Sequence, residues 1–235
     1  GIKNDNNVNA RPQSGPQNAD AVFEVLVEGG MTRFINIFYQ SDTSYHGPIR
    51  SARPTDPTVL RPVGGVLVAS GATGGLIPEI VDIGVPVITD RRPDYFRISS
   101  RRAPHNLYAD TNLLKSNSIS KGYNKIDNPQ PLCTWSDPSF NNWKSNTFLT
   151  LPFSGLTETT WTWNGSSYVR TYYDAYKNKN KDKFIIGRTL QETLDKYHLK
   201  LLLHYFVNHM FILCNYHLLK QLVKEELLFY MVEKC

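Results

Sequence analysis

The feature that most constrains this chain is a break in composition near Tyr176. All 14 prolines and 14 of the 15 glycines precede residue 177, so the strongest turn-forming residues are confined to the first part of the chain. Residues 177–235 are rich in Lys, Leu, Tyr and His, and long helices are the regular structure that this composition favours. The sequence therefore predicts a globular body followed by an atypical Lys/Leu-rich helical tail.

The net charge of +5 does not make the body basic. Residues 1–176 hold 16 Lys/Arg against 15 Asp/Glu, whereas residues 177–235 hold 10 against 6. A nucleic-acid-binding face requires cations gathered on the folded body. We therefore expect no nucleic-acid partner.

The cysteines and the start of the chain bear on two further features, namely disulfide or zinc sites and targeting signals. Cys133, Cys214 and Cys235 are far apart and form no C-x-x-C pair, so neither a disulfide framework nor a zinc site is indicated. We expect no metal and no cofactor. The chain starts at Gly1 without a charged-then-apolar leader, so any targeting signal is expected upstream.

The body has the pattern of an α/β fold with a mixed sheet. The polar residues 1–17 are expected to form a loop. Residues 21–27 and 34–38 predict a hairpin around a Glu-Gly-Gly turn, although the first arm also fits a helical period. Residues 63–70, 76–83 and 85–89 then predict strand, helix and strand, which is a βαβ unit.

Three regions follow from these patterns. Residues 1–125 are predicted to form the α/β domain, residues 126–176 the start of a smaller, truncated β-rich domain, and residues 177–235 the tail. An Asn164-Gly165 turn between alternating arms predicts a hairpin in the second region.

Two of the motifs combine arginine with glycine or serine. Glu28 and Arg33 flank a Gly pair, so a hairpin turn would bring this carboxylate and this guanidinium together, as an ion pair or as an acid/base group. Arg50 and Arg53 stand three apart with Ser51 between them, a spacing at which both can reach one anion.

Two further motifs add hydrogen-bonding groups. Arg11 begins an Arg-Pro-Gln-Ser-Gly loop that can offer donors to an acceptor or serve as a structural turn. Arg102 belongs to an Arg-Arg-Ala-Pro-His-Asn segment with His105 and Asn106. His105 could act as a general acid/base or as a hydrogen-bonded loop histidine.

Taken together, the segments 10–15, 28–34, 47–54 and 100–108 resemble the bacterial YerB-like lipoprotein family in residue identity, order and spacing. Trp161 to Arg170 resembles the opening of that family's smaller C-terminal domain. The resemblance implies an extracytoplasmic, cell-envelope location with the lipidated leader absent from this chain, and it implies no catalytic assignment. Past Tyr173 the chain departs from the family pattern, which we interpret as a reading-frame change or a fusion. The matched motif positions are Arg11, Glu28, Arg33, Arg50, Arg53, Arg102, His105 and Asn106.

Three functions are compatible with these residues. The leading hypothesis is an uncharacterised envelope protein that binds an anionic small molecule or wall component through the Arg/Glu/His set. An envelope hydrolase with His105 and Glu28 as acid/base pair is the rival. The third is a structural partner-binding domain in which the same residues form an internal salt-bridge network. The sequence indicates no oligomeric state.

Overall fold

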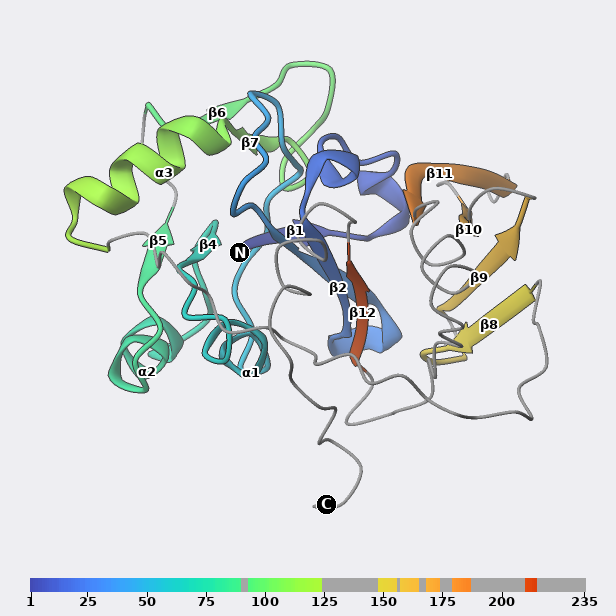
Figure 1. Ribbon diagram of the computed structural model, residues 1–235, viewed down its shortest axis with the longest axis horizontal. Helices are drawn as coiled ribbons and strands as arrows, with labels where there is room; N and C mark the ends of the chain where they lie inside the picture. The colour runs from blue at the N-terminus through green and yellow to red at the C-terminus, as the bar shows by residue number, and fades with distance from the viewer. Residues whose placement is uncertain are drawn as a thin grey trace, which may run out of the picture.

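A computed structural model describes residues 1–89, 93–123, 148–155, 157–164, 168–173, 179–186 and 210–214. Its largest layer is a six-stranded mixed sheet in the order β12-β2-β3-β1-β4-β5 (Figure 1). The strands are β1 (Ile2–Asp5), β2 (Ala21–Leu26), β3 (Thr32–Ile37), β4 (Leu67–Ala69), β5 (Val87–Thr89) and β12 (Met210–Cys214). Three short 3-10 helices, η1 (Val8–Ala10), η2 (Pro16–Asn18) and η3 (Glu28–Gly30), lie in the connections between β1, β2 and β3.

Strand β1 corrects the expectation of a loop over residues 1–17. It pairs antiparallel with β3 and parallel with β4, and all four of its residues are buried. Its sequence is polar because its side chains meet partners from distant parts of the chain. Lys3, for example, forms a fully buried ion pair with Asp56. The apolar alternation that marks most strands is therefore missing here.

The predicted hairpin and βαβ unit are confirmed. Strands β2 and β3 are antiparallel partners on either side of η3, which excludes the helical alternative for the first arm. Strands β4 and β5 are parallel, and the helix α2 (Leu76–Asp82) connects them. Gly84, with φ of 89°, follows the C-cap of α2 and ends the helix in the left-handed conformation typical of a capping glycine.

Each face of the sheet is covered. On one face, α1 (Asp56–Leu60) and α2 pack against Phe23, Ile35 and Leu67. On the other, the two-stranded sheet of β6 (Tyr95–Arg97) and β7 (Leu107–Ala109), with the helix α3 (Thr111–Ser120), packs against Ile2 and Val68. Figure 1 shows α1 and α2 apart from the layer of β6, β7 and α3.

A second, four-stranded antiparallel sheet lies beside β2 in the order β11-β10-β9-β8 (Figure 1). Its strands are β8 (Phe148–Pro152), β9 (Glu158–Trp163), β10 (Tyr168–Tyr173) and β11 (Lys179–Ile186). Leu151, Phe153 and Trp161 of this sheet pack against Val22 and Phe34 of the first. The two arms of the predicted hairpin are confirmed, since Trp161 pairs with Arg170 and Trp163 with Tyr168, whereas Gly165 of the predicted turn lies outside the described residues.

The helical expectation does not hold for the tail segments that the structure describes. Lys179–Ile186 extends the second sheet as β11, past the predicted boundary at residue 176, and Met210–Cys214 pairs with β2 as β12. Open edges of β10 and β2 offer backbone partners that outweigh intrinsic propensity. The other residues of the predicted helical tail lie outside the described ranges.

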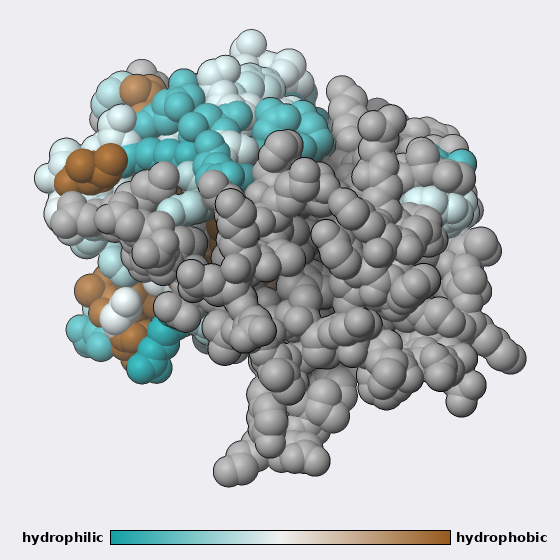
Figure 2. Space-filling model, viewed as in Figure 1, coloured by the Kyte–Doolittle hydropathy of each residue, from teal (hydrophilic) through white to brown (hydrophobic). Residues whose placement is uncertain are grey.

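Among the described residues, exposed apolar side chains lie mainly on two helices. Figure 2 shows hydrophobic patches on the side of α2 and α3, where Val81, Ile83, Leu113 and Ile119 are exposed. Among the helices that the structure describes, none is long and apolar enough to cross a membrane.

Candidate functional site: a charged cluster at the end of strand β1

The predicted motifs meet at the carboxyl end of β1. This strand has the antiparallel β3 on one side and the parallel β4 on the other, so the carboxyl ends of β1 and β4 lie at the same edge of the sheet. In open α/β sheets, ligands bind outside the carboxyl ends of parallel strands. The side chains gathered here are called the charged cluster: Lys3, Asp5, Glu28, Arg33, Arg50, Arg53, Asp56 and His105.

Asp5 is the carboxylate at the centre of this end of the strand. It is 3% exposed. Its Oδ2 lies 2.6 Å from Nδ1 of His105 and 3.3 Å from Nε of Arg50, and its Oδ1 accepts a hydrogen bond from the backbone N–H of Asn7. An ionised carboxylate only accepts hydrogen bonds, so His105 carries its proton on Nδ1 and Nε2 is directed elsewhere.

Arg50 is positioned by an extended segment, residues 46–50, that runs between β1 and β7. Asp5 N–H donates to the carbonyl of Pro48 and Arg50 N–H donates to the carbonyl of Lys3, both at 2.9 Å. On the other edge, Ile49 N–H donates to the carbonyl of Leu107. Hydrogen bonds on both edges fix the backbone of Arg50 beside the end of β1.

The loop after β4 supports the same segment. Ser70 N–H donates to the carbonyl of Arg50 at 3.0 Å, and Ala52 N–H donates to the carbonyl of Gly71 at 2.8 Å. The Ser-Gly-Ala-Thr-Gly-Gly connection therefore lies against Arg50. It contributes backbone geometry to the site.

Arg33, Glu28 and Arg53 form the second part of the cluster. Arg53 donates from Nε to Oε2 of Glu28 at 2.6 Å and from Nη2 to Oε1 of the same carboxylate, a bidentate pair. Arg33 lies 3.5 Å from Glu28 Oε1 and donates from Nη1 to the carbonyl of Ser51 at 2.7 Å. The hydrogen bonds from Arg53 lower the pKa of Glu28 from 4.5 to about 2.

A buried ion pair underlies the cluster. Lys3 Nζ donates to Oδ1 of Asp56, and both side chains are fully buried. The other oxygen of Asp56 accepts the backbone N–H of Arg53 at 2.7 Å. Burial lowers the pKa of Lys3, and the charge of Asp56 opposes that change.

Arg50 retains the most hydrogen-bonding capacity of the three arginines. Its Nε contact with Asp5 is an ion pair without hydrogen-bond geometry. Within the part of the chain that the structure describes, no acceptor is hydrogen-bonded to its guanidinium, whose side chain is 24% exposed. The cluster also has four Lys and Arg side chains against three carboxylates, so it favours an anion.

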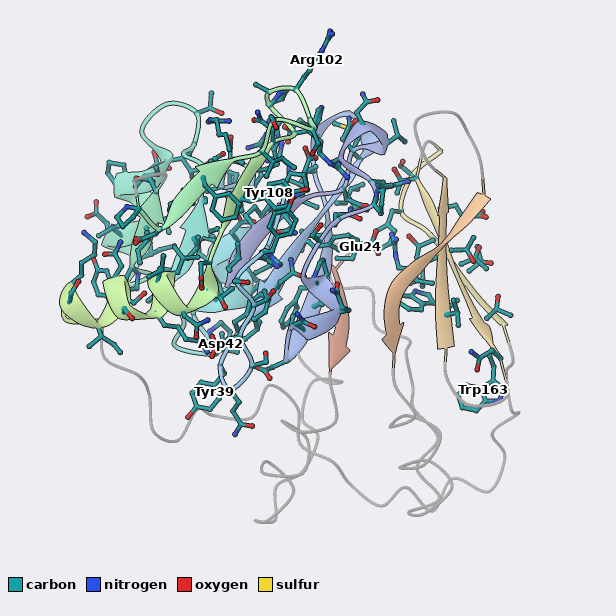
Figure 3. The ribbon with its side chains drawn as sticks, turned by 90° about the horizontal axis from the view of Figure 1, so that it is seen from above. Glu24, Tyr39, Asp42, Arg102, Tyr108 and Trp163 are labelled. Carbon is teal, nitrogen blue, oxygen red and sulfur yellow. The ribbon has the colours of Figure 1, made fainter. Side chains whose placement is uncertain are left out.

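The other predicted residues lie outside the cluster. Arg11 donates from Nε to Oδ1 of Asn6 at 3.0 Å. Asn106 accepts from Nη1 of Arg97 at 2.9 Å. Arg102 accepts the backbone N–H of His105 through its carbonyl, and its side chain projects away from the body in Figure 3. Ser51 contacts the cluster only through its backbone carbonyl, which accepts a hydrogen bond from Arg33.

A second buried network joins the two sheets close to Asp5. Arg170 of β10 donates from Nη2 to Oε1 of Glu24 at 2.7 Å, and their side chains are 2% and 0% exposed. Asn6 donates from Nδ2 to Oε1 of Glu24 at 3.2 Å and to Oγ1 of Thr32 at 2.6 Å. Figure 3 shows Glu24 on the side of the first sheet that faces the second. The residue after Asp5 is therefore tied to the second sheet.

Sequence reasoning missed Asp5, Lys3, Asp56, Glu24 and Arg170. Asp5 and Lys3 fell within the predicted loop. Arg170 carried a usable signal, because it occupies an alternating strand position directly opposite Trp161, and an arginine at an inward position needs a buried acid. In the described ranges, no group of three or more His, Cys, Asp or Glu could hold a metal ion.

Comparisons with known proteins identify related chains. The sequence model described as "Protein of unknown function (DUF3048) N-terminal domain" matches residues 1–124, slightly more than half of the chain. The protein named "Putative lipoprotein YerB" from Bacillus subtilis (strain 168) is 32% identical over 130 residues, which are 54% of this chain and 39% of that protein. The resemblance inferred from the four motifs is thereby confirmed.

A solved structure is similar in fold. The crystal structure of the YerB protein from Bacillus subtilis matches with a TM-score of 0.56 and 24% sequence identity, over 78% of this chain and 61% of that one. At this identity the match shows the fold alone. The chain spans less than two thirds of the length of either relative.

Proposed function

Since this chain belongs to the DUF3048 family, whose description leaves its function open, we propose from the chain's own geometry that it binds an anionic ligand through Arg50 and His105. The single observation that carries this proposal is the state of Arg50. Its backbone is fixed by hydrogen bonds on both sides, yet its guanidinium has an ion pair with Asp5 and no hydrogen bond within the described residues. Planar guanidinium groups with free N–H donors recognise carboxylate and phosphate.

The rest of the charged cluster supports Arg50 in this role. Arg33 and Arg53 are both engaged by Glu28, so they raise the positive potential without being the first donors to a ligand. Asp5 orients His105, which adds a second nitrogen beside the anion. Compared with binding through the whole Arg/Glu/His set, the proposal gives Arg50 the direct contact, gives Arg33 and Arg53 supporting roles, and leaves Arg102 outside the site.

The name of the relative supports the location in this proposal, and the location suggests the class of ligand. A relative named as a lipoprotein supports a place at the cell envelope, outside the cytoplasm. Anions abundant there include the phosphates of wall polymers and the carboxylates of muramyl peptides. We propose that a wall component carrying one of these groups is the ligand.

Isothermal titration calorimetry tests the proposal with inorganic phosphate, glycerol phosphate oligomers and muramyl peptides as titrants. Arg50→Ala should weaken binding of at least one titrant by about tenfold or more, because a hydrogen bond to a charged group contributes roughly 1.5–3 kcal/mol. Arg102→Ala is the matched control, since it removes the same charge from a side chain that projects into solvent. Equal isotherms for wild type and Arg50→Ala would reject the proposed anion site. They would favour the hypothesis that these residues form an internal salt-bridge network.

A second candidate function is hydrolysis with His105 as general base. The contact between Asp5 and Nδ1 of His105 favours it, because a carboxylate that holds one ring nitrogen leaves the other able to accept a proton. Asp5 replaces Glu28 as the acidic partner in this version, since Glu28 contacts Arg53 and Arg33. Turnover of wall polymers that His105→Ala abolishes would separate hydrolysis from binding alone; binding without turnover would reject hydrolysis.

A further inference from the structure

Three aromatic rings stack on the outer face of the β6–β7 pair. Tyr95 and Leu107 point into the core, so Phe96 and Tyr108 lie on the opposite face of these strands. The ring of Tyr45 lies over the ring of Tyr108, with centroids 4.6 Å apart, and 5.9 Å from the ring of Phe96. Tyr45, Phe96 and Tyr108 are called the aromatic platform.

The platform is supported from beneath and open above. Tyr108 is 1% exposed, whereas Tyr45 is 42% exposed and Phe96 is partly exposed. Gly47 packs so closely under Tyr108 that a Cβ atom at this position would lie 2.7 Å from the ring. An exposed tyrosine that is already held by neighbouring rings loses little conformational freedom when a ligand covers it.

Polar groups lie close to the platform. Arg101 donates from Nη2 to the carbonyl of Pro12 at 2.6 Å. Arg97, which is opposite Leu107 in the β6–β7 pair, lies on the other face of these strands and donates to Asn106. Burial raises the pKa of Tyr108 and the positive charge of Arg101 opposes the rise, which places that charge near the rings. In Figure 2, hydrophilic side chains gather over the region of β6 and β7.

We propose that the aromatic platform binds a sugar ring of an anionic saccharide, with Arg101 beside the ring and the anionic group in the charged cluster. A pyranose ring has a flat face of C–H groups, which packs on aromatic rings, and a rim of hydroxyls, which bonds to amide and guanidinium groups. The platform offers both surfaces side by side. The inference rests on the proposed function, because it names the class of molecule that carries the anion.

The platform and the charged cluster lie at two points of one extended segment, because Gly47 packs against Tyr108 and Arg50, three residues further on, contacts Asp5. A saccharide longer than one unit can therefore contact both places. Its anionic group binds at Arg50 and His105, and a sugar ring stacks on Tyr45.

Calorimetric titrations of the whole chain test this with three probes. Sodium phosphate tests the anion alone, an N-acetylglucosamine tetramer tests the sugar alone, and the disaccharide of N-acetylglucosamine and N-acetylmuramic acid carries both. We expect the disaccharide to bind at least tenfold more tightly than phosphate in the wild type. Tyr45→Leu should abolish this gain and leave phosphate binding unchanged, whereas Tyr45→Phe should preserve it.

Tyr39→Leu is the matched control, because Tyr39 is a tyrosine outside the platform. Figure 3 shows it apart from Tyr108. Equal disaccharide affinity in wild type and Tyr45→Leu would overturn the inference while leaving Arg50-dependent phosphate binding as a separate result. Disaccharide binding that depends on Tyr45 without any phosphate binding would support the platform and reject the proposed anion site. Adenosine monophosphate binding as tightly, with the same dependence on Tyr45, would overturn the assignment to a saccharide.

Discussion

Glu24 of β2 and Arg170 of β10 form an ion pair across the two sheets, 146 residues apart in sequence and almost completely buried. Thr159 completes it, since Arg170 Nη2 also donates to Oγ1 of Thr159 at 3.1 Å. Leu151, Phe153 and Trp161 surround the pair with apolar contacts. The second sheet is therefore attached to the first through a charge that water does not reach.

Removing one member of this pair should be strongly destabilising. We expect Arg170→Met to cost about 3–5 kcal/mol in the free energy of unfolding, because Glu24 is left as a buried charge without a counter-ion. The double variant Glu24→Leu/Arg170→Met should lose less than the sum of the two single variants. Urea unfolding measures all three.

The pair of Lys115 and Asp42 provides the control for that series. Both side chains are about one third exposed, and Lys115→Ala should cost less than about 1 kcal/mol. Arg170→Met costing no more than Lys115→Ala would contradict the docking of the second sheet on Glu24.

Acid should destabilise the fold through His46. This side chain is fully buried, and its burial lowers its pKa from 6.5 to about 3. Between these values the unfolded chain binds a proton at His46 that the folded chain does not, so the contribution of His46 to stability is fully present above pH 6.5 and declines as the pH falls toward 3. The slope should be about 1.4 kcal/mol per pH unit.

Urea unfolding at a series of pH values measures this slope, and His46→Gln should flatten it between pH 6.5 and 4. Glu28→Gln is the control, because the lowered pKa of Glu28 affects stability only as the pH falls from 4.5 toward about 2. An unchanged slope in His46→Gln would show that other groups control acid unfolding.

Gly47 should not tolerate a side chain. A Cβ atom there would lie 2.7 Å from the Tyr108 ring and 2.8 Å from the carbonyl of Leu107, neither of which can move freely. We expect Gly47→Ala to cost about 1–3 kcal/mol by overpacking. Gly155→Ala, with no neighbour within 4 Å of its added Cβ, should stay within about 0.5 kcal/mol of the wild type. Thermal unfolding that ranks the two variants equally would argue against the close packing.

Asp5 should determine the tautomer of His105. In the wild type, ¹⁵N NMR of the neutral ring should show the proton on Nδ1, because this nitrogen lies 2.6 Å from the Asp5 carboxylate. Asp5→Ala removes the acceptor and should shift the proton toward Nε2. The signals of His46, which does not contact Asp5, serve as the internal reference. The same His105 tautomer in both proteins would mean that another group orients the ring.

Local patterns predicted much of the fold. The β2–β3 hairpin and the β4–α2–β5 unit follow from apolar periodicity and from glycines at turns, signals that are complete within about thirty residues. Strand β1 could not be predicted in this way, because Lys3 and Asp5 are buried by partners more than fifty residues away. The segments of β11 and β12 depend on open sheet edges that no local pattern reveals.

The candidate site was predicted in part for the same reason. Short motifs with unusual density of Arg, Glu and His identified Arg50, Arg53 and His105, and the structure brings these three into one cluster. Asp5, the partner of Arg50 and His105, belongs to a polar stretch without such a pattern. Arg102 shares its motif with His105, but the turn that directs His105 inward sends the Arg102 side chain outward.

The central claim is that Arg50 and His105, anchored by Asp5, form the anion site. A phosphate titration followed by ¹⁵N NMR of arginine and histidine side chains tests it most directly. The account predicts saturable shifts of the Arg50 guanidinium and of His105 Nε2, with Arg102 unaffected, and loss of the His105 shift in Arg50→Ala. Shifts that are equal at Arg102 and Arg50, or absent from both Arg50 and His105, would contradict it.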